Sequence, residues 1–221
     1  MNIPESFVPA GVLLGTYLIW FMVLLLACWR APWSRLRVGD AHHVFLGAMV
    51  VLLFLWRFEA GVTPGLSFHF LGVTVFTLMF GGALAVIGVS LVTLGVVLSG
   101  GGTTLEMLPL NALLFGVLPV AITQGIYQLV HRMLPHHVFI YIFLCAFFAA
   151  IFSAAIVVFT LVGILTWSQT YSFARIAEEY LPFLPLYLFP EGLLNGMLTT
   201  IFVGIRPQWL STFDDESYLK S

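Results

Sequence analysis

The chain has 221 residues, of which 61% are hydrophobic and only 8% are charged, and its mean hydropathy is +1.06. A soluble domain carries about 25% charged residues, so this chain lacks the polar surface that would coat a soluble globule. The net charge of −2 gives no basic patch for phosphates, and we expect no nucleic-acid partner. The composition therefore predicts an integral protein of the lipid bilayer.

Seven apolar segments have the composition of membrane crossings, for which roughly 20 residues are needed. The third is short and ends at Gly81 and Gly82, where we expect a helical hairpin instead of one overlong helix. The predicted fold class is thus an all-α polytopic membrane protein with about seven transmembrane helices, forming a single transmembrane domain over residues 1–221. The predicted spans are residues 8–28, 42–57, 69–81, 83–99, 112–130, 138–166 and 183–205.

The basic residues are distributed unevenly between the two ends of these spans. If the N-terminus lies outside, only Arg57 and Arg175 share its side. Six of the eight Lys and Arg residues then lie inside, namely Arg30, Arg35, Arg37, Arg132, Arg206 and Lys220. Because Lys and Arg accumulate in cytoplasmic loops, we predict an N-terminus outside, in a multi-pass protein of the cell (inner) membrane. The first apolar run lacks a basic leader and a small-residue cleavage pattern, so we expect it to be retained.

His69 is the histidine that this topology places on the same face as the N-terminus. It begins the third predicted span and follows the turn-forming pair Pro64 and Gly65. An imidazole nitrogen is a preferred ligand for nickel, copper, cobalt or zinc. The sequence thus indicates a metal-capture site on the outer face, with an interfacial histidine bonded to a nearby carbonyl as the alternative.

Glu191 and Asn195 lie one helical turn apart within the last predicted span. A carboxylate inside the membrane costs roughly 2.5–3.5 kcal/mol on insertion scales, so it normally faces a cavity or a partner. A ligand, a counter-charge and a clamp between helices all remain open. Gly192 and Gly196 form a small-residue face suited to close helix packing.

Five further histidines fall on the predicted inner face. Their spacing faintly resembles the histidine boxes of membrane di-iron enzymes, which contain more histidines in tighter groups. We therefore expect these side chains to lie among lipid headgroups, and we expect that the chain is not an enzyme. They are His42, His43, His131, His136 and His137.

Several segments together resemble one known family. Residues 1–9, Met-Asn-Ile-Pro-Glu-Ser-Phe-Val-Pro, are similar to a Met-His-Ile-Pro-Glu-Gly-Phe-Leu-Pro start, and residues 67–72 to a Ser-x-His-Leu-x-Gly segment. Residues 101–111 resemble a Gly-Gly-Ile-Thr-Ala-Leu-Gly-x-Asn stretch, and Glu191-Gly192 and Arg206-Pro207 fall at matching places. In this order they resemble, over most of the chain, the CbiM/NikM family. Its members are the membrane-embedded substrate-capture components of energy-coupling factor (ECF) cobalt and nickel importers, a class of ABC transporter.

This resemblance implies a ligand set and a set of partners. The ligands would be the amine of Met1, the backbone nitrogen and side chain of Asn2, and the imidazole of His69. The transported ion would be a divalent transition metal, nickel or cobalt, with copper or zinc as the alternatives, and there would be no prosthetic group. The partners would be a transmembrane coupling subunit and cytoplasmic ATPase subunits.

The chain departs from the family pattern at position 2, where asparagine replaces histidine. An amide oxygen is a harder donor than imidazole, and three alternatives are open. In the first, the site binds another or more loosely held metal, with Glu5, Asn111 or Glu191 completing the shell. In the second, it captures a metal chelate or another small molecule. In the third, it has lost metal binding, and the chain is an accessory or scaffold subunit of a larger membrane complex.

Overall fold

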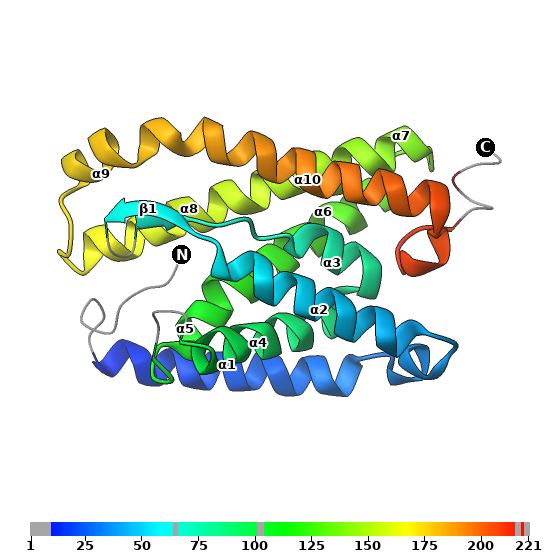
Figure 1. Ribbon diagram of the computed structural model, residues 1–221, viewed down its shortest axis with the longest axis horizontal. Helices are drawn as coiled ribbons and strands as arrows, with labels where there is room; N and C mark the ends of the chain where they lie inside the picture. Colours follow the sequence, from blue (N-terminus) through cyan, green and yellow to red (C-terminus); the bar gives the residue numbers. More distant parts are fainter. Residues whose placement is uncertain (1–9, 64–65, 101–103, 215–217, 219–221) are drawn as a thin grey trace.

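The computed structural model of the protein describes residues 10–63, 66–100, 104–214 and 218. Helices run along one long axis, with a two-stranded hairpin at one end (Figure 1). The elements in chain order are α1 (Ala10–Arg30), η2 (Trp33–Arg37), α2 (Ala41–Arg57), β1 (Ala60–Thr63), β2 (Leu66–Phe68), α3 (Val73–Phe80), α4 (Gly82–Leu98), α5 (Leu108–Asn111), η3 (Ala112–Val117), α6 (Leu118–Met133), α7 (Val138–Ile140), η4 (Tyr141–Phe148), α8 (Ala149–Trp167), α9 (Phe173–Glu179), η5 (Leu181–Phe183), α10 (Leu184–Ile205) and η6 (Pro207–Trp209).

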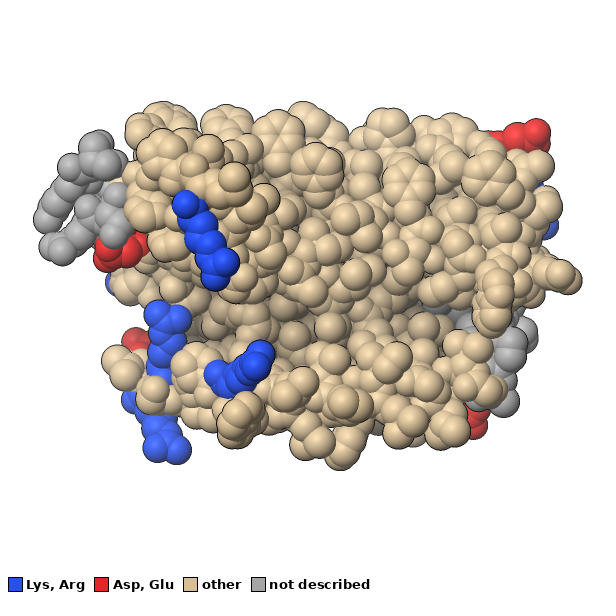
Figure 2. Space-filling view, turned by 180° about the vertical axis from the view of Figure 1, so that it is seen from behind, with Lys and Arg blue, Asp and Glu red and all other residues tan. Residues whose placement is uncertain are grey.

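Several of these elements join into helices long and apolar enough to cross a membrane. In the described part of the chain there are four, at Gly11–Arg30, Leu108–Met133, Val138–Trp167 and Phe173–Ile205, and α2 and α4 are shorter apolar helices. Lys, Arg, Asp and Glu gather toward the two ends of the face in Figure 2, and the band between them shows none of these charged residues. The predicted class, a helical multi-pass membrane protein, is confirmed.

The third predicted span, residues 69–81, contains only the eight-residue helix α3. At 1.5 Å per residue it is about 12 Å long, well short of the roughly 30 Å hydrocarbon core. All eight of its residues are buried, and residues 69–72 before it are not helical. This segment is therefore a half-helix enclosed by its neighbours.

The predicted hairpin between the third and fourth segments is present. Gly81 has a φ of +79°, in the region that only glycine adopts readily, and its N–H donates to the carbonyl of Thr77 at 2.8 Å. The chain reverses there, and α4 returns alongside α3. A Cβ at Gly88 would lie 2.5 Å from the Phe76 ring, so the two helices are closely packed.

The two ends of the bundle differ in composition. The hairpin end holds β1, β2 and the connection from α8 to α9, where the Phe68 and Tyr180 rings stack with centroids 4.2 Å apart. At the opposite, arginine end, the Arg35 guanidinium donates to the Ser211 carbonyl at 3.5 Å. The described basic residues divide as the sequence groups them, with Arg57 and Arg175 at the hairpin end. Those at the arginine end are Arg30, Arg35, Arg37, Arg132 and Arg206.

The close contact of α10 with η4 and α8 gives a test of the packing. A Cβ at Gly192 would lie 2.7 Å from Cγ1 of Ile151 and 3.1 Å from the carbonyl oxygen of Phe147. Gly192→Ala is therefore expected to lower the free energy of unfolding by about 1–3 kcal/mol, because the helices must move apart. The measurement is thermal unfolding of the purified protein in detergent.

Gly204 is the matched control on the same helix, since a Cβ there meets nothing within 4 Å. Gly204→Ala should leave stability unchanged or slightly raised, because alanine is the better helix former. Equal losses in both variants would contradict the proposed role of the Gly192 contact.

Candidate metal-capture site

His69 lies in the connection from β2 to α3, outside the membrane-spanning helices, and its side chain is only 5% exposed. The Trp56 ring stacks on the imidazole with centroids 5.5 Å apart and planes inclined by 18°. The edge of Phe115, from the π-helical turn η3, approaches at 5.8 Å. Trp56 is itself fixed, because its indole N–H donates to the Leu71 carbonyl at 2.9 Å. The imidazole is thus held between aromatic rings.

The chemistry of His69 suits a ligand. Its Nδ1 is buried and has no hydrogen-bond partner among the described residues. Burial lowers the pKa of the His69 imidazole well below its ordinary value, because a charged ring is poorly solvated there. The ring is therefore neutral at physiological pH, which is the form that binds a metal ion.

Glu191 holds the backbone that carries His69. The carboxylate, on α10, accepts hydrogen bonds from the N–H groups of Leu71 and Gly72, each at 2.9 Å. Gly72 is the residue before α3 and has a φ of +62°. A carboxylate at this position satisfies the free N–H groups of a helix start and interacts favourably with the helix dipole. Glu191 therefore caps α3 across 120 residues of sequence.

Asn195 completes this clamp from the next turn of α10. Its amide oxygen accepts from the Val75 N–H at 2.9 Å, and its amide nitrogen donates to Oε1 of Glu191 at 2.8 Å. Glu191 and Asn195 are both fully buried, at 1% and 0% exposure. Of the roles open to this pair in the sequence, the contacts support a clamp between helices.

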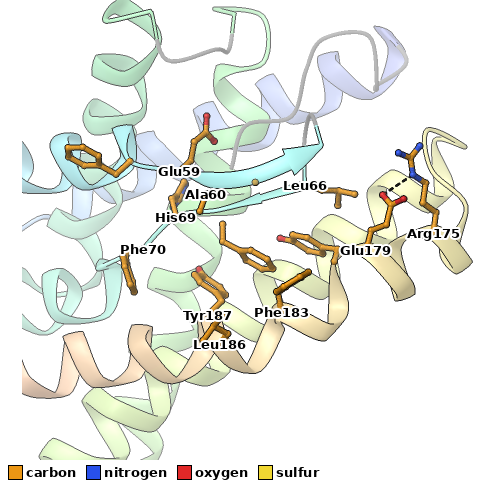
Figure 3. Close-up of a pocket in the computed structure, with 14 residues that line it drawn as sticks. Glu59, Ala60, Leu66, His69, Phe70, Arg175, Glu179, Phe183, Leu186 and Tyr187 are labelled. Carbon is orange, nitrogen blue, oxygen red and sulfur yellow. Dashed lines mark hydrogen bonds and ion pairs between the residues drawn. The ribbon is translucent and has the colours of Figure 1, made fainter.

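A cavity of about 880 Å³ opens beside His69 at the hairpin end. The hairpin forms one wall, and α9, η5 and the start of α10 form the other (Figure 3). His69 and the ion pair of Arg175 with Glu179, 2.9 Å apart, lie toward opposite sides of it. The lining is mainly aromatic, from Phe58, Phe68, Phe70, Tyr180, Phe183 and Tyr187.

The other predicted site residues divide into two groups. Met1, Asn2 and Glu5 lie outside the described residues. Asn111 is buried at 1% exposure in α5, about one helical turn before Phe115, whose ring contacts His69. Sequence reasoning missed Trp56, Phe115, Tyr180 and Tyr187, since aromatic residues are common throughout this apolar chain and none stands in a recognisable motif.

The five histidines predicted on the inner face do not form a metal-binding cluster among the described residues. His131 and His136 stack at the arginine end with centroids 4.4 Å apart, and His131 Nδ1 lies 3.3 Å from the Tyr218 hydroxyl. Within the described part of the chain, no three His, Cys, Asp or Glu side chains converge as a metal-binding group. The geometry gives no support to a metalloenzyme that uses these histidines.

The fold and site define a class: a polytopic helical membrane protein with a half-helix inside the bundle and a buried, unpaired imidazole. Comparison with protein families matches residues 2–209 to the family described as "Cobalt uptake substrate-specific transmembrane region", CbiM. The chain belongs to this family, as its sequence motifs indicate, and it is a transport component and not an enzyme.

The structural comparison agrees with this fold. The crystal structure of a transition metal transporter matches with a TM-score of 0.63 at 15% sequence identity, over 93% of this chain and 93% of that chain. Comparison with curated proteins gave no match. At this identity the structural likeness shows a shared fold.

The clamp generates a stability prediction. In Glu191→Gln, the amide nitrogen would face a backbone N–H, so at least one buried donor loses its partner. The free energy of unfolding should fall by about 1–3 kcal/mol, measured by thermal unfolding in detergent. Glu179→Gln is the control, because that exposed ion pair with Arg175 contributes at most about 1 kcal/mol. A Glu191→Gln protein as stable as the control variant would contradict the clamp.

Proposed function

We propose that this chain is the substrate-binding membrane component of an ECF-type ABC importer for a divalent transition metal ion of the nickel or cobalt type. The ion enters at the hairpin end, which faces outward, and binds near the N-terminus. The observation that carries the proposal is the buried, neutral imidazole of His69, whose Nδ1 has no partner among the described residues, in a chain of the cobalt uptake family.

The proposed ligands are the amine of Met1, the backbone nitrogen and side chain of Asn2, and His69. The described His, Cys, Asp and Glu residues supply no metal-binding group of three, which favours a site completed by the N-terminal amine and backbone. Nitrogen donors of this kind suit nickel and other ions of tetragonal preference. Copper and zinc compete for such donors, so geometry sets the selectivity.

The orientation and partners follow from charge and chemistry. Five described arginines lie at the arginine end and two at the hairpin end, which favours a cytoplasmic arginine end. The glycines at positions 100–102 are followed by Thr-Thr and not by the Lys-Ser/Thr of a phosphate-binding loop. In this proposal, cytoplasmic ATPase subunits supply the transport energy and act through a transmembrane coupling subunit.

The first test is elemental analysis of the detergent-purified protein after exposure to nickel, cobalt, copper and zinc. We expect about one equivalent of one metal in the unmodified chain. Loss of that metal is expected in His69→Ala and also when residues are added before Met1, because both changes remove a nitrogen donor. His136→Ala, at the arginine end, is the control and should retain the metal.

Metal retained in both His69→Ala and the extended chain would remove the proposed ligand set. No metal in any form would favour the alternative of an accessory or scaffold subunit. Co-purification of the chain with proteins other than ATPases would then be the expected companion result.

The pH dependence of binding follows from proton competition for the same nitrogens. A terminal amine has an ordinary pKa of about 7.7–8.0 and histidine of about 6.5, and burial moves the pKa of His69 to a more acid range. Nickel affinity should therefore begin to fall below about pH 8, as the amine gains a proton. A second fall should come only well below the ordinary imidazole pKa, because burial lowers the pKa of His69. An affinity that stays constant between about pH 8.5 and 4.5 would contradict nitrogen ligation.

A further inference from the structure

Three buried polar atoms that belong to residues lining one cavity lack partners. They are Nδ1 of His69 and the hydroxyl oxygens of Tyr180 and Tyr187, none of which has a hydrogen-bond partner among the described residues. A buried polar group without a partner is costly, so such groups are rare in folded proteins and call for a specific explanation. Three of them around one cavity indicate a site built for a ligand that supplies their partners.

The size of the cavity argues against a bare ion as its occupant. A transition metal ion bound by nitrogen ligands lies about 2 Å from each of them, and such a shell fills only a small part of about 880 Å³. Pockets of roughly 300–1,000 Å³ are the range that takes small organic molecules. The aromatic walls, which include Phe68 and Phe183, suit the carbon skeleton of such a molecule.

The unpartnered atoms identify the chemistry of that molecule. A tyrosine hydroxyl is a good donor to a carboxylate, and the two hydroxyls belong to residues seven positions apart that line one wall. The neutral imidazole offers a lone pair to a metal ion. One ligand satisfies all three atoms: a metal ion already wrapped by a small molecule that bears carboxylates, with one coordination position left for His69.

The Phe68 ring packs against the rings of both tyrosines. Both hydroxyl oxygens are closed to solvent. Phe68, on strand β2, stacks on Tyr180 at 4.2 Å and contacts Tyr187 at 4.9 Å between centroids. A ligand therefore reaches either hydroxyl only if the side chains that cover it move, and Phe68 is one of the side chains packed on these rings.

We propose that the cavity at the hairpin end binds the metal as a chelate with a small carboxylate-bearing molecule, using His69 for the metal and Tyr180 and Tyr187 for the carboxylates. This inference rests on the proposed function, since it specifies the form in which the transported ion arrives. It explains how a site with Asn2 in place of histidine still binds metal: the chelator supplies the missing donors.

Equilibrium dialysis of the full chain in detergent tests the inference. The probes are nickel alone, nickel with citrate, and nickel with two equivalents of histidine, with the chelators carrying carbon-14. We expect about one equivalent of one chelator to be retained together with nickel, and tighter nickel binding with that chelator than without it. The chelators alone should not be retained.

Two variants examine the hydroxyls. Tyr180→Phe and Tyr187→Phe should each weaken binding of the chelate roughly tenfold, because each removes a hydrogen bond to a charged acceptor. Neither should change the affinity for nickel alone or lower the thermal midpoint measured without nickel, because the hydroxyls have no partner in the protein. Tyr127→Phe, which removes the hydroxyl of a tyrosine stacked on His131 at the arginine end, is the matched control and should bind as the unmodified chain does.

The outcomes separate the two proposals. Nickel bound equally tightly with and without the chelators, with neither chelator retained, would overturn the chelate inference and leave the importer proposal standing. Tyrosine variants that bind the chelate normally, or that unfold at lower temperature without nickel, would also overturn it. Failure to retain nickel in any form would overturn both proposals.

Discussion

The structure depends on a carboxylate that caps a helix inside the membrane protein. In hydrocarbon, each unsatisfied backbone group costs several kcal/mol, so irregular backbone is tolerated only where protein groups satisfy it. Residues 69–72, between β2 and α3, are irregular backbone packed against the bundle, and Glu191 accepts hydrogen bonds from the N–H groups of Leu71 and Gly72. This carboxylate stabilises the start of α3 inside the bundle and thereby fixes the segment that carries His69.

Glu191 can cap α3 only if α10 packs closely against its neighbours. One segment of α10 supplies both the polar residues of the cap and the glycines that allow this close packing. Glu191 and Asn195 point toward α3, whereas a Cβ at the neighbouring Gly192 or Gly196 would press on Phe147. Small residues let the helices meet, and the polar residues beside them then reach the α3 backbone. Because Asn195 bonds to both Glu191 and Val75, the clamp is one connected network and fixes the orientation of the half-helix.

The sequence predicted the features that depend on composition and local pattern. Apolar run lengths predicted a helical multi-pass membrane protein, although residues 69–81 contain only the half-helix α3. The excess length of the run around Gly81 and Gly82 predicted the reversal, which the positive φ of Gly81 makes possible. Glu191 and Asn195 were recognised as exceptional because charged and amide groups are expensive in a membrane. Their partners, the N–H groups of residues 71, 72 and 75, were not predictable, because every residue but proline carries the same donor. The contacts of Trp56 and Phe115 with His69 were not predictable for a similar reason, because nothing in the local sequence distinguishes these two residues from the many other apolar residues of the chain.

The clamp and the cavity have opposite character, and the difference bears on transport. At the clamp, the Glu191 and Asn195 side chains are fully hydrogen-bonded and hold the backbone two residues beyond His69. At the cavity, Tyr180 and Tyr187 leave their hydroxyls unpaired, and their rings rest on Phe68 of the short hairpin. An importer component must bind its substrate from one side and release it to the other, so its site cannot be satisfied by the protein alone. In the proposed site, the substrate supplies the partners that the His69 imidazole and the Tyr180 and Tyr187 hydroxyls lack within the protein. Binding and release of the substrate then make and break these interactions.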